Sequence, residues 1–276
     1  MDIVFNVNQL GLVGFGATLT SLLRNCSNSS SLRIWILCSG VNSNDKENIK
    51  GLLELEYYEG MLEFVEFDAR ATFGHLRSLH GDWTGYGRLL IADHVVSDYA
   101  LYLDADLIVL LDVLNLREFP FNEDILAAVY GCEVSHALDN LFFIQKLNWP
   151  EDRGYFNSGV LLFNLKKWRS SNIQAKWKEI AEQYPGELVS HDQTLLNTVC
   201  EGKFARLPPV YNVEWLPGAG RPPDIQNSII HFVGSPKPWD IFGSLIHQGF
   251  DTWKAYQVSF WEKKYGKLSL DKIRRT

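Results

Sequence analysis

The sequence predicts an α/β protein with a Rossmann-like central sheet and helices on both faces of that sheet. Three observations favour this fold. Short apolar runs typical of strands alternate with longer runs typical of helices along most of the chain. The chain has 276 residues, enough for one large domain with a substantial core. Its 46% hydrophobic and 21% charged residues are those of an ordinary globular protein, which excludes disordered and fibrous proteins.

The order of the elements predicts a parallel sheet. The predicted strands are residues 3–8, 32–37, 62–67, 100–103, 125–129 and 158–165. The predicted helices are residues 16–25, 44–55 and 88–96. Strands that alternate with helices pair in parallel, because each helix crosses a face of the sheet before the chain returns. Residues 133–156 and 214–226 are expected to be long loops of the kind that form lids or binding loops.

Charge and cysteine usage limit the partners and the compartment. The net charge of −7 argues against nucleic acid as a partner, because binding to phosphates needs a positive surface. The four cysteines form no CxxC pair, so we expect reduced thiols in a cytoplasmic protein. The first residues carry no positively charged targeting segment, and the apolar run 107–111 is too short to span a membrane.

Two aspartates follow the apolar strand 100–103. Asp104 and Asp106 are two residues apart, so in an extended chain both side chains point to one side and can face one ion. Open α/β sheets bind ligands at the carboxyl ends of their strands. Two carboxylates there suit Mg²⁺ or Mn²⁺ holding a diphosphate. Some phosphatases place the same DxD pattern after a strand and use the first aspartate as a nucleophile, so this alternative stays open.

A second motif begins in the apolar strand near residue 229. His231 can give a nitrogen atom to a divalent ion. Gly234 lets the backbone approach a phosphate closely. Lys237 lies between Pro236 and Pro238 and offers a positive charge to a leaving phosphate. The combination HxxGxxKPW is far more specific than any one of its residues.

Together these motifs resemble glycosyltransferase family 8, and most of all its bacterial lipopolysaccharide galactosyl- and glucosyltransferases. The resemblance covers most of the chain, up to about residue 240. Matching stretches occur in the family's order at residues 1–5, 86–89, 101–106, 155–165, 191–193 and 231–239. The resemblance implies a GT-A fold, the fold of nucleotide-diphospho-sugar transferases. It also implies a UDP-sugar donor, a Mn²⁺ cofactor with Mg²⁺ as the alternative, and transfer with retention of anomeric configuration.

The resemblance implies roles for individual residues as well. Asp104, Asp106 and His231 would coordinate the metal ion. The implied donor-binding residues are Asn8, Arg88, Asp104, Ala105, Asn157, Asp192, Gln193, Gly234 and Lys237. Three of these would be catalytic: Lys237 would stabilise the leaving β-phosphate, and Asp192 or Gln193 the positive charge at the anomeric carbon. Each of four residues also has a structural alternative: Arg88 a surface cation, Asn157 a contact to a turn backbone, Asp192 a carboxylate at a helix start, and Gln193 an ordinary helix residue.

Two points of the expected chemistry stay open. The acceptor hydroxyl can attack from the side of the leaving group, with the departing phosphate taking its proton. Alternatively Gln193 can act as a transient nucleophile, although an amide is a poor one. The base is the second point, because the family often has an acidic residue followed by an Asn-Tyr pair after the first strand. Here Asn8 can pair with uracil, but Leu10 and Gly11 supply no stacking tyrosine.

The C-terminal residues 251–276 differ from the rest of the chain. They carry seven lysines and arginines against three acidic residues, interleaved with five aromatic residues. We therefore divide the chain into a catalytic domain of residues 1–250 and a basic, aromatic tail. The tail can attach the protein peripherally to the inner face of an anionic membrane. A terminal helix whose aromatic side chains pack on the core would give the same pattern.

The expected function is transfer of a hexose, galactose or glucose, from a UDP-sugar to a saccharide acceptor. The acceptor would be lipopolysaccharide or another lipid-linked saccharide. A sugar-nucleotide binding module without catalysis is the alternative of a different class, and a DxD phosphatase is the third. Intact metal and phosphate motifs favour the transferase.

Overall fold

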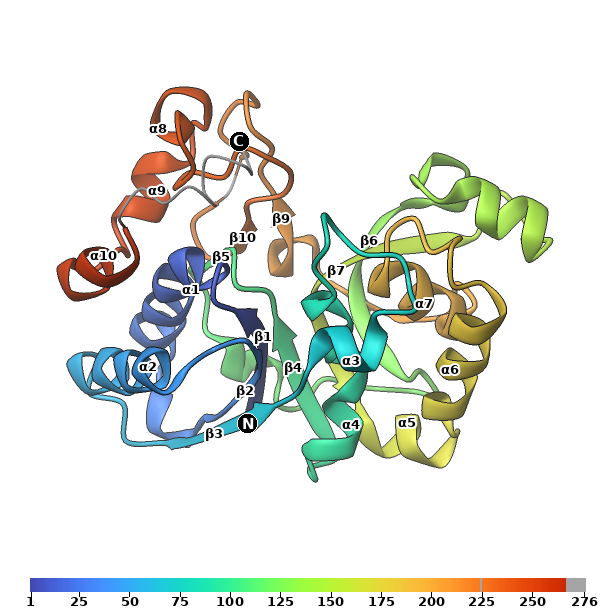
Figure 1. Cartoon of the computed structure of the whole chain (residues 1–276), viewed down its shortest axis with the longest axis horizontal. Coiled ribbons are helices and arrows are strands. Elements are labelled where there is room, and N and C mark those ends of the chain that lie inside the picture. Colours follow the sequence, from blue (N-terminus) through green and yellow to red (C-terminus); the bar gives the residue numbers. More distant parts are fainter. Residues whose placement is uncertain (224, 267–276) are drawn as a thin grey trace.

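The computed structural model describes residues 1–223 and 225–266, and its centre is a seven-stranded sheet (Figure 1). The strand order is β3-β2-β1-β4-β7-β6-β8. The bounds are β1 (Asp2–Asn8), β2 (Arg33–Ser39), β3 (Met61–Glu66), β4 (Tyr99–Leu103), β6 (Leu126–Glu133), β7 (Gly154–Asn164) and β8 (Ala205–Leu207). The six strands expected from the sequence are all present, and β8 is an additional one.

The strand directions confirm the parallel prediction for one half of the sheet and correct it for the other. β1 runs parallel to β2 and β4, and β2 runs parallel to β3. β7 runs antiparallel to both of its neighbours, β4 and β6. The expectation of an all-parallel sheet is therefore wrong at β7. The physical reason is that burial on both faces requires a continuous apolar run whichever way the strand points. The sequence of such a strand therefore does not reveal its direction.

A second sheet of three strands brings distant motifs together. Its order is β5-β10-β9, with bounds β5 (Leu107–Val109), β10 (Ile229–His231) and β9 (Val213–Glu214). β10 pairs antiparallel with β5, and this register sets His231 opposite Leu107. Because Leu107 follows Asp106 directly, the histidine lies beside the DxD turn. β9 ends at Glu214, the first residue of the loop expected over 214–226, and is a strand that was not predicted.

Helices cover both faces of the large sheet, as predicted (Figure 1). Their bounds are α1 (Leu12–Asn25), α2 (Ser43–Leu55), α3 (Ala69–Phe73), α4 (Ile91–His94), α5 (Leu165–Ser170), α6 (Ile173–Gln183), α7 (Asp192–Cys200), α8 (Gly243–Ile246), α9 (Phe250–Lys254) and α10 (Ser259–Tyr265). Successive β1 residues point to opposite faces: Ile3 and Phe5 pack with α1 and α2, and Val4 packs in the core that contains α6 and α7.

Two helices differ from the sequence prediction. The expected helix 88–96 is divided into the 3₁₀ helix η2 (Thr84–Leu90) and α4. α1 begins at Leu12, four residues earlier than expected, and includes Gly14 and Gly16. Glycine weakens an isolated helix, but here it permits contact: a Cβ on Gly16 would collide with the indole of Trp261. Residues 133–156 also contain more structure than the expected loop, including a π-helix at Phe142–Lys146.

The aromatic residues near the C-terminus belong to the core. Trp261 is completely buried, and its Nε1 donates a hydrogen bond to the carbonyl of Leu12 at 2.7 Å. The Tyr265 hydroxyl donates to Asp45 at 2.9 Å, and Trp253 is also buried. For these residues the packed alternative holds. The tail cations Lys267, Lys272, Arg274 and Arg275 lie outside the described residues. Among the residues that are described, no helix has the length and apolarity needed to cross a membrane.

Candidate active site

The DxD turn and the histidine meet at the carboxyl end of β4. One ligand atom from each of Asp104, Asp106 and His231 lies within 4.8 Å of the others. The turn is held in place because the backbone N–H of Asp104 donates to the carbonyl of Gly159 on β7, at 2.9 Å. Both aspartates are partly exposed, whereas His231 is buried. The sequence prediction that these three residues form one cluster is confirmed.

The two carboxylates have different partners. Asp104 Oδ1 accepts hydrogen bonds from Arg88 Nη2 at 2.8 Å and from the Tyr102 hydroxyl at 2.6 Å. Asp106 Oδ2 accepts from Lys237 Nζ at 2.6 Å. Each aspartate thus has one oxygen bound to protein donors and one oxygen turned toward His231. The distances from His231 Nε2 are 4.0 Å to Asp104 Oδ2 and 3.3 Å to Asp106 Oδ1.

These three inward-facing atoms fit a divalent cation. Asp106 Oδ1 is buried and accepts no hydrogen bond from any described residue, which is costly unless another partner satisfies it. Two carboxylate oxygens and one imidazole nitrogen are ligands that Mn²⁺ accepts. The space is kept open by Gly159, since a Cβ at that position would collide with the His231 ring and come within 3.0 Å of Asp104 Oδ2.

Asn212 orients the histidine, and sequence reasoning missed it. His231 Nδ1 lies 3.0 Å from Asn212 Oδ1, and the amide oxygen can only accept. This contact places the ring proton on Nδ1 and leaves the Nε2 lone pair facing the carboxylates. Asn212 in turn donates from Nδ2 to Asn157 Oδ1 at 3.2 Å. No motif surrounds Asn212, so only the three-dimensional contact reveals its role.

Electrostatics separate the two aspartates. Burial raises the pKa of Asp104 above its ordinary value, although Arg88 acts in the opposite direction. Burial would also raise the pKa of Asp106, but the Lys237 ammonium, 2.6 Å from its Oδ2, outweighs burial and holds that pKa well below its ordinary value. Asp106 is therefore ionised over the whole physiological range. Asp104 binds a proton more readily, and this proton competes with a cation.

We expect Asp104 to titrate at a higher pH than Asp106 in the metal-free protein. Because the raised pKa keeps a proton on Asp104 to higher pH, lowering the pH should weaken Mg²⁺ binding through Asp104 first. Carboxyl-carbon NMR of the two aspartates, recorded across a pH series with and without Mg²⁺, measures this order. Addition of Mg²⁺ should shift the Asp104 titration to lower pH. Identical titration of the two carboxyls would contradict the prediction.

Arg88 is a buried cation that links the two parts of the site. It is 7% exposed, its Nη2 bonds to Asp104, and its Nε lies 3.0 Å from Asp192 Oδ2. Its Nη1 donates to both the carbonyl and the hydroxyl of Ser158, at 2.7 and 2.8 Å. The guanidinium also lies over the Tyr102 ring at 4.5 Å. The structure therefore shows Arg88 positioning two carboxylates. Its expected contact with the donor stays a prediction.

Asp192 and Gln193 begin α7 and face the same β7 segment. Gln193 Oε1 accepts from the backbone N–H of Ser158 at 2.9 Å, and its Nε2 donates to the Tyr155 hydroxyl at 2.8 Å. Asp192 Oδ2 accepts from the Ser158 hydroxyl at 3.3 Å. Next to Ser158, Asn157 Oδ1 accepts from the N–H of Gly159. The expected sugar-binding residues thus converge on residues 157–159, adjacent to the metal cluster.

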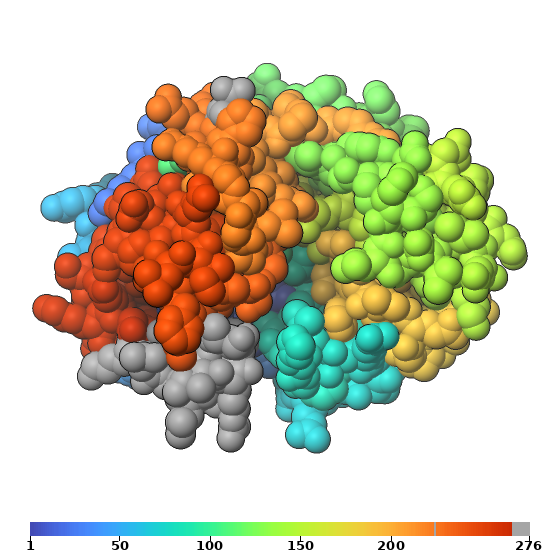
Figure 2. Space-filling model, turned by 90° about the horizontal axis from the view of Figure 1, so that it is seen from above, coloured from blue at the N-terminus to red at the C-terminus, as the bar shows by residue number. Residues whose placement is uncertain are grey.

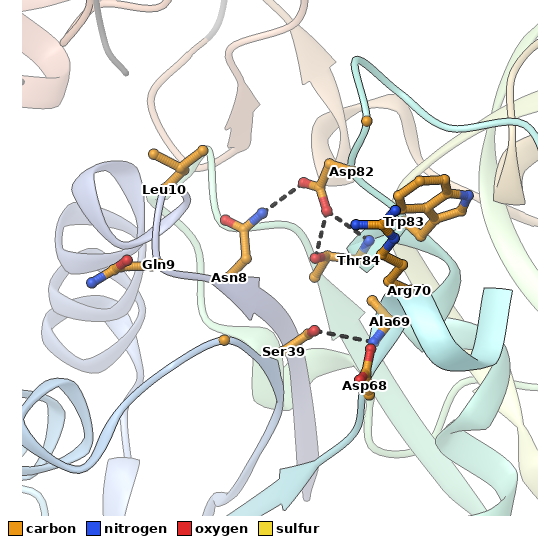
Figure 3. Close-up of a pocket in the computed structure, with 12 residues that line it drawn as sticks. Asn8, Gln9, Leu10, Ser39, Asp68, Ala69, Arg70, Asp82, Trp83 and Thr84 are labelled. Atoms are coloured by element: carbon orange, nitrogen blue, oxygen red, sulfur yellow. Dashed lines mark hydrogen bonds between the residues drawn. The ribbon is translucent and has the colours of Figure 1, made fainter. Parts of the chain in front are cut away.

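The remaining expected donor residues lie around the same edge of the sheet. Ala105 is the middle residue of the DxD turn, and Gly234 has a positive φ of 76°. Lys237 also donates to the Phe232 carbonyl. Asn8 ends β1 and lines a pocket of about 350 Å³ (Figure 3), together with residues from the end of β2, the start of α3 and the start of η2. Figure 2 shows the molecule hollowed between its C-terminal part and the green and yellow part.

Comparison with known proteins identifies the class. The structure superposes on the galactosyltransferase LgtC, solved in complex with donor and acceptor sugar analogs, with a TM-score of 0.76, 22% identity and full coverage of both chains. The fold is therefore the GT-A fold of glycosyltransferases, as expected.

The sequence comparisons then give the family. A model of glycosyl transferase family 8 matches residues 2–242, so the chain belongs to this family of glycosyltransferases. General stress protein A of Bacillus subtilis (strain 168) is 25% identical over 244 residues, 82% of each chain. The lipopolysaccharide 1,3-galactosyltransferase of Salmonella typhimurium (strain LT2) is 24% identical over 283 residues, 94% of this chain and 75% of that protein.

Proposed function

We propose that this glycosyltransferase moves a hexose, galactose or glucose, from a UDP-sugar to a saccharide acceptor, with retention of configuration and with Mn²⁺ or Mg²⁺ as cofactor. The observation that carries the proposal is the cluster of Asp104, Asp106 and His231 with Lys237 beside it. The relative named as a lipopolysaccharide 1,3-galactosyltransferase supports galactose and a lipid-linked acceptor. Family membership argues against the phosphatase alternative.

The residues around the cluster fit the charge changes of sugar transfer. When bound, the divalent cation would neutralise charge on the donor diphosphate. The bond from the anomeric carbon to the phosphate oxygen breaks, and Lys237 places a cation beside the oxygen that becomes negative. Asp192 offers a carboxylate to the carbon that becomes positive. The acceptor oxygen bonds to that carbon, and its proton passes to the departing phosphate.

The hydrogen bonds of Gln193 favour this direct route over a glutamine nucleophile. Its Oε1 accepts from the Ser158 N–H, and its Nε2 is bound to Tyr155. These two hydrogen bonds hold both ends of the amide in place, and an amide oxygen is in any case a poor nucleophile. We therefore assign Gln193 the role of an oriented polar contact to the sugar.

A panel of nucleotide sugars tests the proposal. Thermal stability is measured with UDP-, GDP-, ADP- and CDP-linked hexoses, each with and without Mn²⁺, because a true donor stabilises the folded state by mass action. UDP-galactose or UDP-glucose should raise Tm only when Mn²⁺ is present, and should then be hydrolysed slowly. Tm shifts without hydrolysis would support the binding module. No shift with any UDP-sugar would contradict the proposal.

Lys237→Ala should lower kcat more than it raises KM for the donor. The negative charge on the leaving phosphate grows toward the transition state, so an ion-pairing cation stabilises that state more than the bound substrate. We expect kcat to fall at least about tenfold, or about 1.4 kcal/mol in the barrier. Steady-state kinetics measure separately the changes in kcat and KM. The matched control is Lys254→Ala, which changes a lysine on α9 whose side chain is 41% exposed. An effect confined to KM would make Lys237 a binding residue only.

We further propose cytoplasmic localisation with peripheral attachment to an anionic membrane through the last ten residues. Residues 267–276 contain four cations and one acidic residue, and each cation near an anionic leaflet contributes about 1 kcal/mol. Deleting 267–276 leaves Trp261 and Tyr265 in place. The deletion should release the protein from phosphatidylserine vesicles at low salt and leave donor hydrolysis unchanged. Equal sedimentation of both forms with vesicles would contradict attachment by this segment.

A further inference from the structure

The pocket beside Asn8 contains a carboxylate to which the sequence motifs gave no role. Figure 3 shows Asp82 and Asn8 directed toward one another at the pocket wall. Asn8 Nδ2 donates to Asp82 Oδ2 at 2.6 Å. Asp82 comes from the chain just before η2, whereas Asn8 ends β1, so the pair joins two separate elements. Both side chains are partly exposed to the pocket.

The contacts of Asp82 leave a single acceptor position. Its Oδ1 accepts from both the N–H and the hydroxyl of Thr84, at 2.9 and 2.7 Å. A carboxylate oxygen has two lone pairs, so Oδ1 is saturated. Within residues 1–223 and 225–266, only Asn8 donates to Oδ2, which retains one lone pair. The Asn8 amide is fixed as well, because its Oδ1 accepts from the N–H of Gly11 at 2.8 Å. Its Nδ2 therefore faces Asp82 and keeps one hydrogen unused.

We propose that Asp82, positioned by Asn8 and Thr84, reads the base of the nucleotide donor and selects uracil. Asp82 Oδ2 accepts the N3–H of uracil, and the second hydrogen of Asn8 Nδ2 donates to the adjacent carbonyl oxygen. The proposal rests on the proposed function, and it makes Asp82 a specificity-determining residue. It assigns the acceptor for the base to the start of η2, where the sequence analysis placed recognition on Asn8 alone.

The remaining acceptor position distinguishes the bases. In the orientation assigned to uracil, cytosine presents a lone pair at N3 where uracil presents N–H, so the Asp82 carboxylate would repel it. Guanine presents two neighbouring donors, N1–H and the N2 amino group. These pair with a carboxylate through both oxygens, and Oδ1 is already occupied by Thr84. A guanine N2 amino group would therefore remain unpaired, and an unpaired buried polar group is costly. Uracil presents one donor, N3–H, between two carbonyl acceptors. The N3–H pairs with the free lone pair of Asp82 Oδ2, and one carbonyl oxygen accepts the free hydrogen of Asn8 Nδ2.

The pocket is placed correctly for a base whose phosphates reach the metal cluster. Thr84 lines the pocket, and Arg88, four residues later on η2, bonds to Asp104. A 3₁₀ helix rises about 2 Å per residue, so the two ends lie roughly 8 Å apart along its axis. A ribose that connects a base to its diphosphate can bridge this distance. The Asn6 side chain fixes the segment by donating to the carbonyls of Thr84 and Gly85.

Asp82→Asn tests the proposal, with UDP and CDP as the probes. In this variant the side-chain oxygen can still accept from Thr84, so the amino group takes the place of Oδ2 and opposes the uracil N3–H. Calorimetric titration with Mn²⁺ present should show that UDP binding weakens at least about tenfold, while CDP binding is unchanged or stronger. Asp82→Ser keeps a hydroxyl for the Thr84 N–H and removes the carboxylate. Asp82→Ser should also lose the preference for UDP. The same result in two variants would show that the loss does not come from a folding defect in one of them.

Asp68→Asn is the matched control, because it removes a carboxylate from the wall of the same pocket, where Asp68 caps α3 by accepting from the N–H of Ala71 and asparagine can replace it. It should change UDP and CDP binding by the same factor. Equal losses of UDP and CDP affinity in both Asp82 variants would reduce Asp82 to a helix-capping residue and overturn the inference, and so would a wild-type preference for CDP. A wild-type protein that binds no uridine nucleotide would overturn the proposed function itself.

Discussion

Replacing Asp106 with asparagine should lower the rate of sugar transfer at least a hundredfold, and Asp104→Asn should do the same. A hundredfold loss corresponds to about 2.7 kcal/mol in the activation barrier. Each change replaces a charged oxygen that faces His231 with a neutral amide of the same shape, so the cluster loses one anionic metal ligand. Transfer assays at saturating Mn²⁺, together with Mn²⁺ titration of each variant, measure the effect.

Two controls make this prediction specific. Asp112→Asn changes the next aspartate along the chain, which caps a turn through its Oδ1 and can be replaced there by asparagine. That variant should keep full activity. Circular dichroism should show that all three variants are folded. Full activity of Asp104→Asn or Asp106→Asn, or wild-type activity in EDTA, would exclude the metal role of the cluster.

Arg88→Met should destabilise the protein more than any other change near the site. It leaves the carboxylates of Asp104 and Asp192, whose side chains are 22% and 11% exposed, without their shared cation. Removing one partner of a buried ion pair costs about 3–5 kcal/mol in the free energy of unfolding. Urea denaturation monitored by tryptophan fluorescence measures this loss. Transfer activity should be lost as well, because both carboxylates are freed to move or to bind protons.

The control for Arg88 is a cation in an ion pair whose two side chains are both exposed. Lys146 Nζ lies 3.2 Å from Glu187 Oε2, and the two side chains are 51% and 41% exposed. Lys146→Met should therefore cost less than about 1 kcal/mol in the free energy of unfolding. Arg88→Lys should recover part of the stability, since it restores the charge without the fork of donors. Equal losses in Arg88→Met and Lys146→Met would show that the buried network contributes nothing special.

The metal cluster could be predicted because its residues stand in short, dense motifs. Asp104 and Asp106 follow an apolar strand, and His231 is followed by a glycine, a lysine and two prolines. Local sequence carries this information, and the structure placed the three side chains together. The sheet edge was predictable for the same reason, because strand ends in an α/β sheet collect ligands on one side.

The contacts that orient these residues could not be predicted in the same way. Asn212 and Ser158 act through hydrogen bonds to His231 and Arg88, which lie 19 and 70 residues away in the sequence. Nothing local distinguishes them from other polar residues in turns and strands. The direction of β7 was missed because burial, and not direction, determines its apolar composition. The early start of α1 was missed because the benefit of its glycines lies in contact with Trp261, whereas helix propensity counts only their cost.

The contact between Trp261 and the first helix has a consequence for synthesis of the chain. The tryptophan and its hydrogen-bond acceptor Leu12 are separated by 249 residues. Ribosomes add roughly 5–20 residues per second, so the interval between the two is on the order of ten seconds or more. During this interval the surface of α1 around Gly16 faces water while the sheet behind it can already form. A nascent chain of this enzyme would therefore expose this part of α1 to chaperones until α10 emerges and Trp261 covers it.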